Sequence, residues 1–269
     1  MAMTTAHAAW PTAVWSQTPS SKTHFPILES DSTLHLPRIL CLHGGGTNAR
    51  IFRAQCRALR SQLTPKFRLV FADAPFFSDP GPDVESVYAS WGPFRSWLTS
   101  QVPFEQQQVF DAGRVDASIR DAIAQDDRLG ATGPVVGVLG FSQGARMAAS
   151  LLFRQQMHGS QGFTFRDARI EFRFAVLLAG RGPLLFPWPS PGYVDTREAL
   201  LHLPTVHVHG LGDVGIRMHR ELLHRCCEKG TARLVEWEGG HRVPIKTRDV
   251  AAVVDEILHA AMCTDSIEF

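Results

Sequence analysis

Short, mostly apolar runs alternate along this chain with segments in which apolar residues recur every three or four positions. A short run of branched apolar residues is typical of a buried strand, and the longer spacing is typical of a helix with one buried face. The runs occupy residues 38–42, 67–72, 135–139, 172–178, 204–209 and 232–237. Strands that alternate with helices predict an α/β fold with a mostly parallel sheet of about six strands flanked by helices.

Helical spacing follows most of these runs. It predicts helices at residues 49–63, 112–129, 145–157, 214–229 and 247–262, and a short helix at 195–201. Asn48 stands where a side-chain cap for the first helix is expected.

Residues 76–111 show neither period and are rich in proline and aromatic residues, which predicts an ordered insertion rather than a polar linker. A chain of 269 residues suits one large α/β domain or two small ones. We therefore expect a single domain over residues 1–269, with residues 76–111 as a small, aromatic-rich, lid-like insertion.

The sequence Gly-Phe-Ser-Gln-Gly at residues 140–144 stands between the third predicted strand and the helix that follows it. A Gly-x-Ser-x-Gly pattern in that position is a nucleophile elbow, in which a sharp turn holds the serine outward in a strained backbone conformation. Glycine is expected on either side because a Cβ there would collide with the neighbouring strand or helix. A plain strand-to-helix turn is the alternative, and the context favours a catalytic Ser142.

A serine hydroxyl needs a base within hydrogen-bond reach, and the base needs an acid to orient it. In such a fold, reactive groups gather outside the carboxyl ends of the strands. His241 follows the last predicted strand on a glycine-rich turn, and Asp213 follows the strand before it. The order serine, aspartate, histidine is that of the α/β-hydrolase fold. Asp213 has the alternative role of a helix cap, and Asp195 and Glu198 are the alternative acids.

Attack on a carbonyl places negative charge on its oxygen, and backbone N–H groups must stabilise that charge. One donor is expected from the amide of Gln143, directly after the serine. The other is expected from the glycine run after His43, with Gly45 favoured and Gly46 next. His43 itself is expected to support this loop by hydrogen bonding rather than to serve as a second base.

Several motifs together resemble the family serine hydrolase (FSH) branch of the α/β-hydrolases. They are Leu-His-Gly at residues 42–44, Asp-Ala-Pro at 73–75, Gly-Pro-Phe-x-x-Trp at 92–97, the elbow at 140–144, Gly-x-x-Asp at 210–213 and Gly-His at 240–241. Within that branch the chain is most similar to fungal trans-acting thioesterases of the lovastatin-pathway type, which free a polyketide from its synthase. Other members of the branch resemble carboxylesterases. The triple glycine at residues 44–46 departs from the branch, where many members carry a bulkier residue after His-Gly.

The resemblance implies a serine hydrolase that cleaves an acyl thioester through an acyl-enzyme. Its expected partner is a polyketide or fatty acyl chain carried transiently on the acyl carrier domain of a polyketide synthase. A general carboxylesterase that acts on short- or medium-chain acyl esters is the alternative. A non-catalytic ligand-binding member of the fold is a remote third possibility.

The aromatic side chains of the insertion are expected to lie over the elbow and to line an apolar acyl channel. Those assigned to the substrate are Phe76, Phe77, Trp91, Phe94 and Trp97. Phe186 and Trp188 are expected to close the opposite wall. The alternative for each ring is that it only packs the insertion onto the domain.

Composition narrows the remaining classes of partner. The formal net charge is +1 and the basic residues form no stripe, which argues against nucleic acid or an anionic membrane. The five cysteines are typical of buried thiols in an intracellular protein rather than of a disulfide framework. No Cys/His spacing is typical of a zinc site, so no metal is expected, and the chemistry needs no cofactor. With no secretory signal, we expect a cytoplasmic enzyme.

Overall fold

The structure is a computed structural model that describes residues 31–99, 111–158, 170–185 and 200–263. Every element below belongs to the compact unit of residues 32–269. Several sequence predictions lie outside the described residues: most of the short helix at 195–201, the alternative acids Asp195 and Glu198, and the rings of Phe186 and Trp188.

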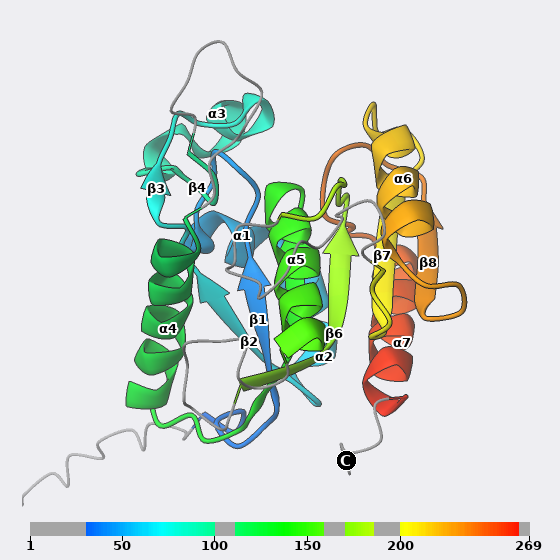
Figure 1. Ribbon diagram of the computed structural model, residues 1–269. Coiled ribbons are helices and arrows are strands. Elements are labelled where there is room, and N and C mark those ends of the chain that lie inside the picture. Colours follow the sequence, from blue (N-terminus) through cyan, green and yellow to red (C-terminus); the bar gives the residue numbers. More distant parts are fainter. Residues whose placement is uncertain (1–30, 100–110, 159–169, 186–199, 264–269) are drawn as a thin grey trace, which may run out of the picture. The chain divides into compact units, whose positions relative to one another are not determined.

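Six parallel strands form one sheet, as the apolar runs predict (Figure 1). The strands are β1 (Arg38–Leu42), β2 (Arg68–Ala72), β5 (Val135–Phe141), β6 (Ile170–Leu178), β7 (Thr205–Gly210) and β8 (Ala232–Trp237). Their order across the sheet is β2-β1-β5-β6-β7-β8. The strand order reverses between β1 and β5, and the crevice of a parallel sheet opens at such a switch point.

Helices cover both faces of the sheet. They are α1 (Ala49–Gln55), α2 (Arg57–Leu63), α4 (Ala112–Arg128), α5 (Gln143–His158), α6 (Ile216–Cys226) and α7 (Thr247–Met262). The helix predicted at 49–63 is divided at Cys56, which ends α1 and precedes α2. Asn48 caps α1 as predicted, since its side chain accepts a hydrogen bond from the Ile51 amide.

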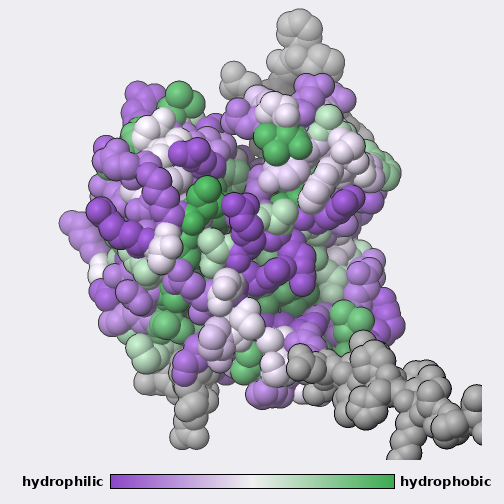
Figure 2. Space-filling view, turned by 180° about the vertical axis from the view of Figure 1, so that it is seen from behind, coloured by the Kyte–Doolittle hydropathy of each residue, from purple (hydrophilic) through white to green (hydrophobic). Residues whose placement is uncertain are grey.

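Two apolar layers fix these helices to the sheet. On the front face in Figure 1, Val115 of α4, Leu151 of α5 and Leu222 of α6 belong to one buried cluster. Behind the sheet, Phe52 of α1 and Val253 of α7 belong to the other. Polar residues occupy most of the rear surface, with apolar ones in small groups between them (Figure 2). Among the described residues, no helix combines the length and apolar character that crossing a bilayer requires.

The insertion contains short regular elements where the sequence shows no period. β3 (Phe76–Phe77) pairs antiparallel with β4 (Arg95–Ser96), and α3 (Pro82–Tyr88) and the 3-10 helix η1 (Ala89–Trp91) lie between them. These elements lie beyond the carboxyl ends of the strands, at the same end as the turn between β5 and α5 (Figure 1).

Candidate active site

The turn between β5 and α5 has the geometry that the elbow pattern predicts. Ser142 has a φ of 54°, in the left-handed region that a residue with a side chain rarely adopts. Its amide donates to the Leu178 carbonyl at 2.9 Å, which ties the turn to the end of β6. A Cβ on Gly140 would lie 2.2 Å from the Gly144 carbonyl oxygen, and one on Gly144 would lie 2.1 Å from that of Leu42. Only glycine fits at these two positions.

Three residues from three strand ends meet at this turn. His241 Nε2 lies 2.9 Å from Ser142 Oγ, and His241 Nδ1 lies 2.6 Å from Asp213 Oδ2. The carboxylate only accepts hydrogen bonds, so the proton of a neutral His241 ring sits on Nδ1. Nε2 is then free to accept the serine proton. The ring also packs against Phe141, with centroids 5.0 Å apart.

Asp213 is buried and fully engaged. Its Oδ1 accepts a hydrogen bond from the Gly215 amide at 2.7 Å, while Oδ2 faces His241. Burial by itself would raise the pKa of Asp213, but its contacts with Gly215, His219 and His241 outweigh it and lower the pKa to about 2. The carboxylate is therefore charged at neutral pH. It also accepts from the amide of Gly215, which is the N-cap residue of α6, so Asp213 is not itself the helix cap considered as its alternative role.

His219 is a member of this cluster that the sequence reasoning missed. It is fully buried on α6, and its Nε2 lies 2.9 Å from Asp213 Oδ2. The signal that points to it is its place on the apolar stripe of an amphipathic helix, in register with buried Leu222 and Cys226. A histidine there must find a polar partner inside the protein.

Asp213, His219 and His241 are the only group of metal-binding side chain types within 4.8 Å of one another in the described part of the chain. Ligands bound tetrahedrally at about 2.0–2.2 Å from a metal sit more than roughly 3 Å apart. The separation between His241 Nδ1 and Asp213 Oδ2 is 2.6 Å, so a shared proton accounts for this contact better than a metal does.

The glycine loop after β1 faces the elbow. A Cβ on Gly45 would lie 3.2 Å from the Gln143 side chain, so the two predicted donor residues are neighbours. The amide of Gly46, the second choice, is already occupied, because it donates to the Arg95 carbonyl at 2.9 Å. Within the described residues, the amides of Gly45 and Gln143 have no hydrogen-bond acceptor. Gln143 also opens α5, where the helix dipole favours negative charge.

His43 supports this loop from below. Its Nε2 accepts a hydrogen bond from the Ala74 amide at 3.0 Å, and its Nδ1 lies 2.7 Å from the Gly44 carbonyl. Burial lowers the pKa of His43 to about 4, so the ring is neutral. The adjacent Asp73 carboxylate accepts from the Ala49 amide at the start of α1. The Asp-Ala-Pro element thus joins the loop, the helix and the strand end.

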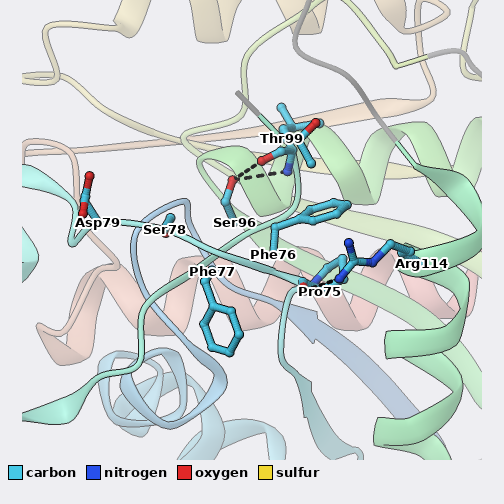
Figure 3. A pocket seen from close by; sticks show the side chains of 9 residues that line it. Pro75, Phe76, Phe77, Ser78, Asp79, Ser96, Thr99 and Arg114 are labelled. Atoms are coloured by element: carbon cyan, nitrogen blue, oxygen red, sulfur yellow. Dashed lines mark hydrogen bonds between the residues drawn. The ribbon is translucent and has the colours of Figure 1, made fainter. Parts of the chain in front are cut away.

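The aromatic residues of the insertion divide into different environments. A cavity of about 700 Å³ is lined by Pro75, Phe76, Phe77, Ser78, Asp79, Ser96, Leu98, Thr99 and Arg114 (Figure 3). Phe76 lies under the Arg114 guanidinium, at 4.4 Å, whereas Phe77 points to the other side of the strand. Ser142 does not line this cavity. Ser96 connects the cavity to the elbow, because its hydroxyl lies 3.2 Å from Gln143 Oε1.

Trp97 was expected to line the acyl channel, and this expectation is wrong. The side chain is fully buried, and its Nε1 donates to the His43 carbonyl at 2.8 Å. Trp97 therefore supports the glycine loop. Trp91 and Phe94 do not line the cavity either. The Arg50 guanidinium lies over the Trp91 ring, 4.1 Å from the centroid of that ring. For these two rings, contact with substrate stays a prediction. The cavity also carries charged Asp79 and Arg114, so it is less apolar than expected.

Residues 32–253 match the Serine hydrolase (FSH1) family. The chain belongs to this family. A "Probable esterase" of Aspergillus terreus is 57% identical over 235 residues, which cover 85% of this chain and 90% of the relative. "Esterase pigG" of Monascus ruber is 54% identical over 263 residues, which cover 88% and 96%. The chain is thus a serine hydrolase enzyme.

A solved structure of low sequence identity shares the fold of this chain. Acyl-protein thioesterase 2 of Zea mays is 20% identical, with a TM-score of 0.51 over 86% of this chain and 96% of that one. The likeness concerns the fold alone. It agrees with the predicted fold class, a six-stranded parallel sheet with helices on both faces.

Proposed function

We propose that Ser142, His241 and Asp213 are the catalytic triad of this serine hydrolase, and that it cleaves an acyl thioester by way of an acyl-enzyme. The observation that carries the proposal is the unbroken series of contacts from Asp213 Oδ2 to His241 Nδ1, at 2.6 Å, and from His241 Nε2 to Ser142 Oγ, at 2.9 Å. These distances are within the reach that proton transfer requires.

In this mechanism His241 Nε2 takes the hydroxyl proton while Ser142 Oγ bonds to the acyl carbon. The carbon–sulfur bond then breaks, and His241 returns the proton to the leaving sulfur. A water molecule next gives its proton to His241 and attacks the acyl carbon, and the ester bond to Ser142 breaks as the proton returns to Oγ. Asp213 stays charged throughout and stabilises the His241 imidazolium.

The amides of Gly45 and Gln143 are the proposed oxyanion donors. Both lack an acceptor among the described residues, and both border the elbow. Gly45 is the only partly exposed glycine of the loop, with Gly44 and Gly46 buried. Donors that are fixed before the reaction stabilise developing charge without reorganisation.

The choice of a thioester rests on the resemblance to trans-acting polyketide thioesterases. Its substrate would be a polyketide or fatty acyl chain held by a carrier protein. The alternative, a carboxylesterase for short- or medium-chain esters, is favoured by the name esterase that both fungal relatives carry. A non-catalytic role fits poorly, because all three triad side chains are present and in contact.

The insertion at residues 76–111 is proposed as a lid of the single hydrolase domain. Its Phe76 and Phe77 line the cavity that Ser96 joins to Gln143, which supports a role for these two rings in binding the acyl group. A cavity of about 700 Å³ lies within the range of small-molecule sites.

The test compares acyl-carrier thioesters with simple aryl esters as substrates for the purified enzyme. Ser142→Ala should abolish turnover and labelling by a fluorophosphonate, while Ser86→Ala, at an exposed serine of α3, should change neither. Fast hydrolysis of aryl esters with slow release from the carrier would favour the esterase. Labelling that persists in Ser142→Ala would remove Ser142 from its proposed role.

A further inference from the structure

His219 makes two close contacts from inside the protein, one through each ring nitrogen. Nδ1 lies 2.9 Å from the Gly180 carbonyl oxygen, and Nε2 lies 2.9 Å from Asp213 Oδ2. The side chain is fully buried, so its ring nitrogens have no contact with bulk water. Both partners are oxygens that only accept hydrogen bonds.

A neutral histidine carries one N–H and one lone pair. In either neutral tautomer of His219, an unprotonated ring nitrogen with partial negative charge would lie 2.9 Å from an oxygen that only accepts hydrogen bonds. A ring protonated on both nitrogens removes this conflict. The approach of Nε2 to Oδ2 is oblique for a hydrogen bond, yet opposite charges at this distance attract in any orientation.

The groups around His219 are consistent with a positive charge there. Asp213 is the anion in contact with it. His209 on β7 packs at 5.6 Å between ring centroids, and burial, the leading cause, lowers the pKa of His209 to about 4, so this neighbour is neutral at pH 7. His241 stacks at 6.1 Å. Arg181 is a cation close to this end of α6, since its guanidinium lies against Gly215.

We propose that His219 is a positioning residue, a buried imidazolium that holds Asp213 in place for His241 and balances part of its charge. The proposal rests on the triad proposed above. Gly215 fixes Oδ1 of the carboxylate and His219 holds Oδ2, so the carboxylate keeps one orientation toward His241.

The charge of His219 has a consequence that simple packing lacks. A carboxylate paired with a cation attracts the His241 proton less than an unpaired carboxylate does. His241 therefore becomes an active base at lower pH than it would beside Asp213 alone. Removing the cation should move the acid limb of the kcat/KM profile to higher pH.

The decisive experiment compares His219→Gln, His219→Phe and the control His224→Gln, at an exposed histidine of the same helix. Both His219 variants should shift the acid limb upward by roughly half to one pH unit. His219→Phe should lower kcat roughly ten- to a hundredfold, and His219→Gln less, because its amide still donates to Asp213. His224→Gln should match the unmodified protein in both measurements. A fixed acid limb in folded variants would overturn the proposal.

A direct measurement on the unmodified protein keeps the proposal testable even if the variants fold poorly. In ¹⁵N-histidine NMR at pH 7, both ring nitrogens of His219 should carry protons, and one unprotonated nitrogen would contradict this. Activity that EDTA abolishes and Zn²⁺ restores would also overturn it, since the cluster would then hold a metal. A failure of the triad proposal would give a different result: the unmodified protein would neither hydrolyse esters nor react with a fluorophosphonate.

Discussion

At Ser142 a φ of 54° costs free energy that the surrounding backbone must offset. The Leu178 carbonyl holds the Ser142 amide, and the Ser142 carbonyl accepts from the amides of Ala145 and Arg146 in the first turn of α5. The close approaches at Gly140 and Gly144 leave the turn no room to relax. The hydroxyl is thus presented to His241 by its neighbours along the chain.

Asp213→Asn tests the proposed role of Asp213 as the acid that orients His241. The amide keeps the size of the side chain but loses the charge, and it can present an N–H where His241 needs an acceptor. We expect kcat to fall by about 10⁴, with KM little changed, in steady-state hydrolysis of an aryl ester. A nearly normal rate would instead transfer the role to Asp195 or Glu198.

At the scale of elements, the insertion and the glycine loop hold each other in place. The Arg95 amide donates to the Thr47 carbonyl at 2.7 Å, and the Gly81 amide donates to that of Gly46 at 3.0 Å. Gln143 Oε1 accepts from the Trp97 amide at 2.8 Å, which joins the elbow to the same hairpin. The insertion therefore fixes the loop that is proposed to stabilise the oxyanion.

Substitutions of Asn48 can distinguish its contacts with the insertion from its role as the cap of α1. Its Nδ2 donates to the Trp91 and Pro93 carbonyls at 2.7 and 3.0 Å, while its Oδ1 caps α1. Asn48→Ser retains a capping oxygen but loses both donations, so amide exchange should quicken in residues 76–97 and kcat should fall several-fold.

Asn48→Ala is the matched variant, because it loses the cap as well. Its free energy of unfolding should be lower than that of Asn48→Ser by about 1 kcal/mol. Hydrogen exchange measures the amide exchange rates of the insertion, and urea unfolding measures the free energy of unfolding. Unchanged exchange in the insertion of Asn48→Ser would show that Asn48 does not anchor it.

At the scale of the whole molecule, buried histidines make the fold sensitive to acid. Burial, in each case the leading cause, lowers the pKa of His43 to about 4, of His207 to about 3 and of His209 to about 4. In the unfolded chain these rings titrate near their ordinary pKa of about 6.5. Below that pH the unfolded state binds protons that the folded state does not, so stability falls as the pH falls.

The expected loss is steepest between about pH 6 and pH 4, at roughly 4 kcal/mol per pH unit if all three rings contribute. The lowered pKa of Asp213 adds a further loss between about pH 4 and pH 2, as its carboxylate becomes protonated. Urea unfolding at pH 6, 5 and 4 measures the first slope. His209→Leu should reduce it by about 1.4 kcal/mol per pH unit, whereas exposed His35→Leu should leave it unchanged.

The sheet, its helices and the meeting of Ser142, Asp213 and His241 are all predictable from the amino-acid sequence. Apolar periodicity marks each strand, and parallel strands bring their carboxyl ends to one edge whatever lies between them. Residues placed directly after strands can therefore be located from strand order alone. The elbow glycines are also predictable, because their constraint is local to the turn.

Contacts between side chains from distant segments of the chain become visible in the folded structure. Trp97 sits in an aromatic-rich insertion in the sequence, yet it is buried under the glycine loop, and Gly46 gives its amide to Arg95. His219 belongs to a helix with no catalytic motif, and it meets Asp213 because α6 packs its apolar stripe onto the sheet beside β7. Such contacts depend on the packing of elements against one another, which a pattern read along one chain does not contain.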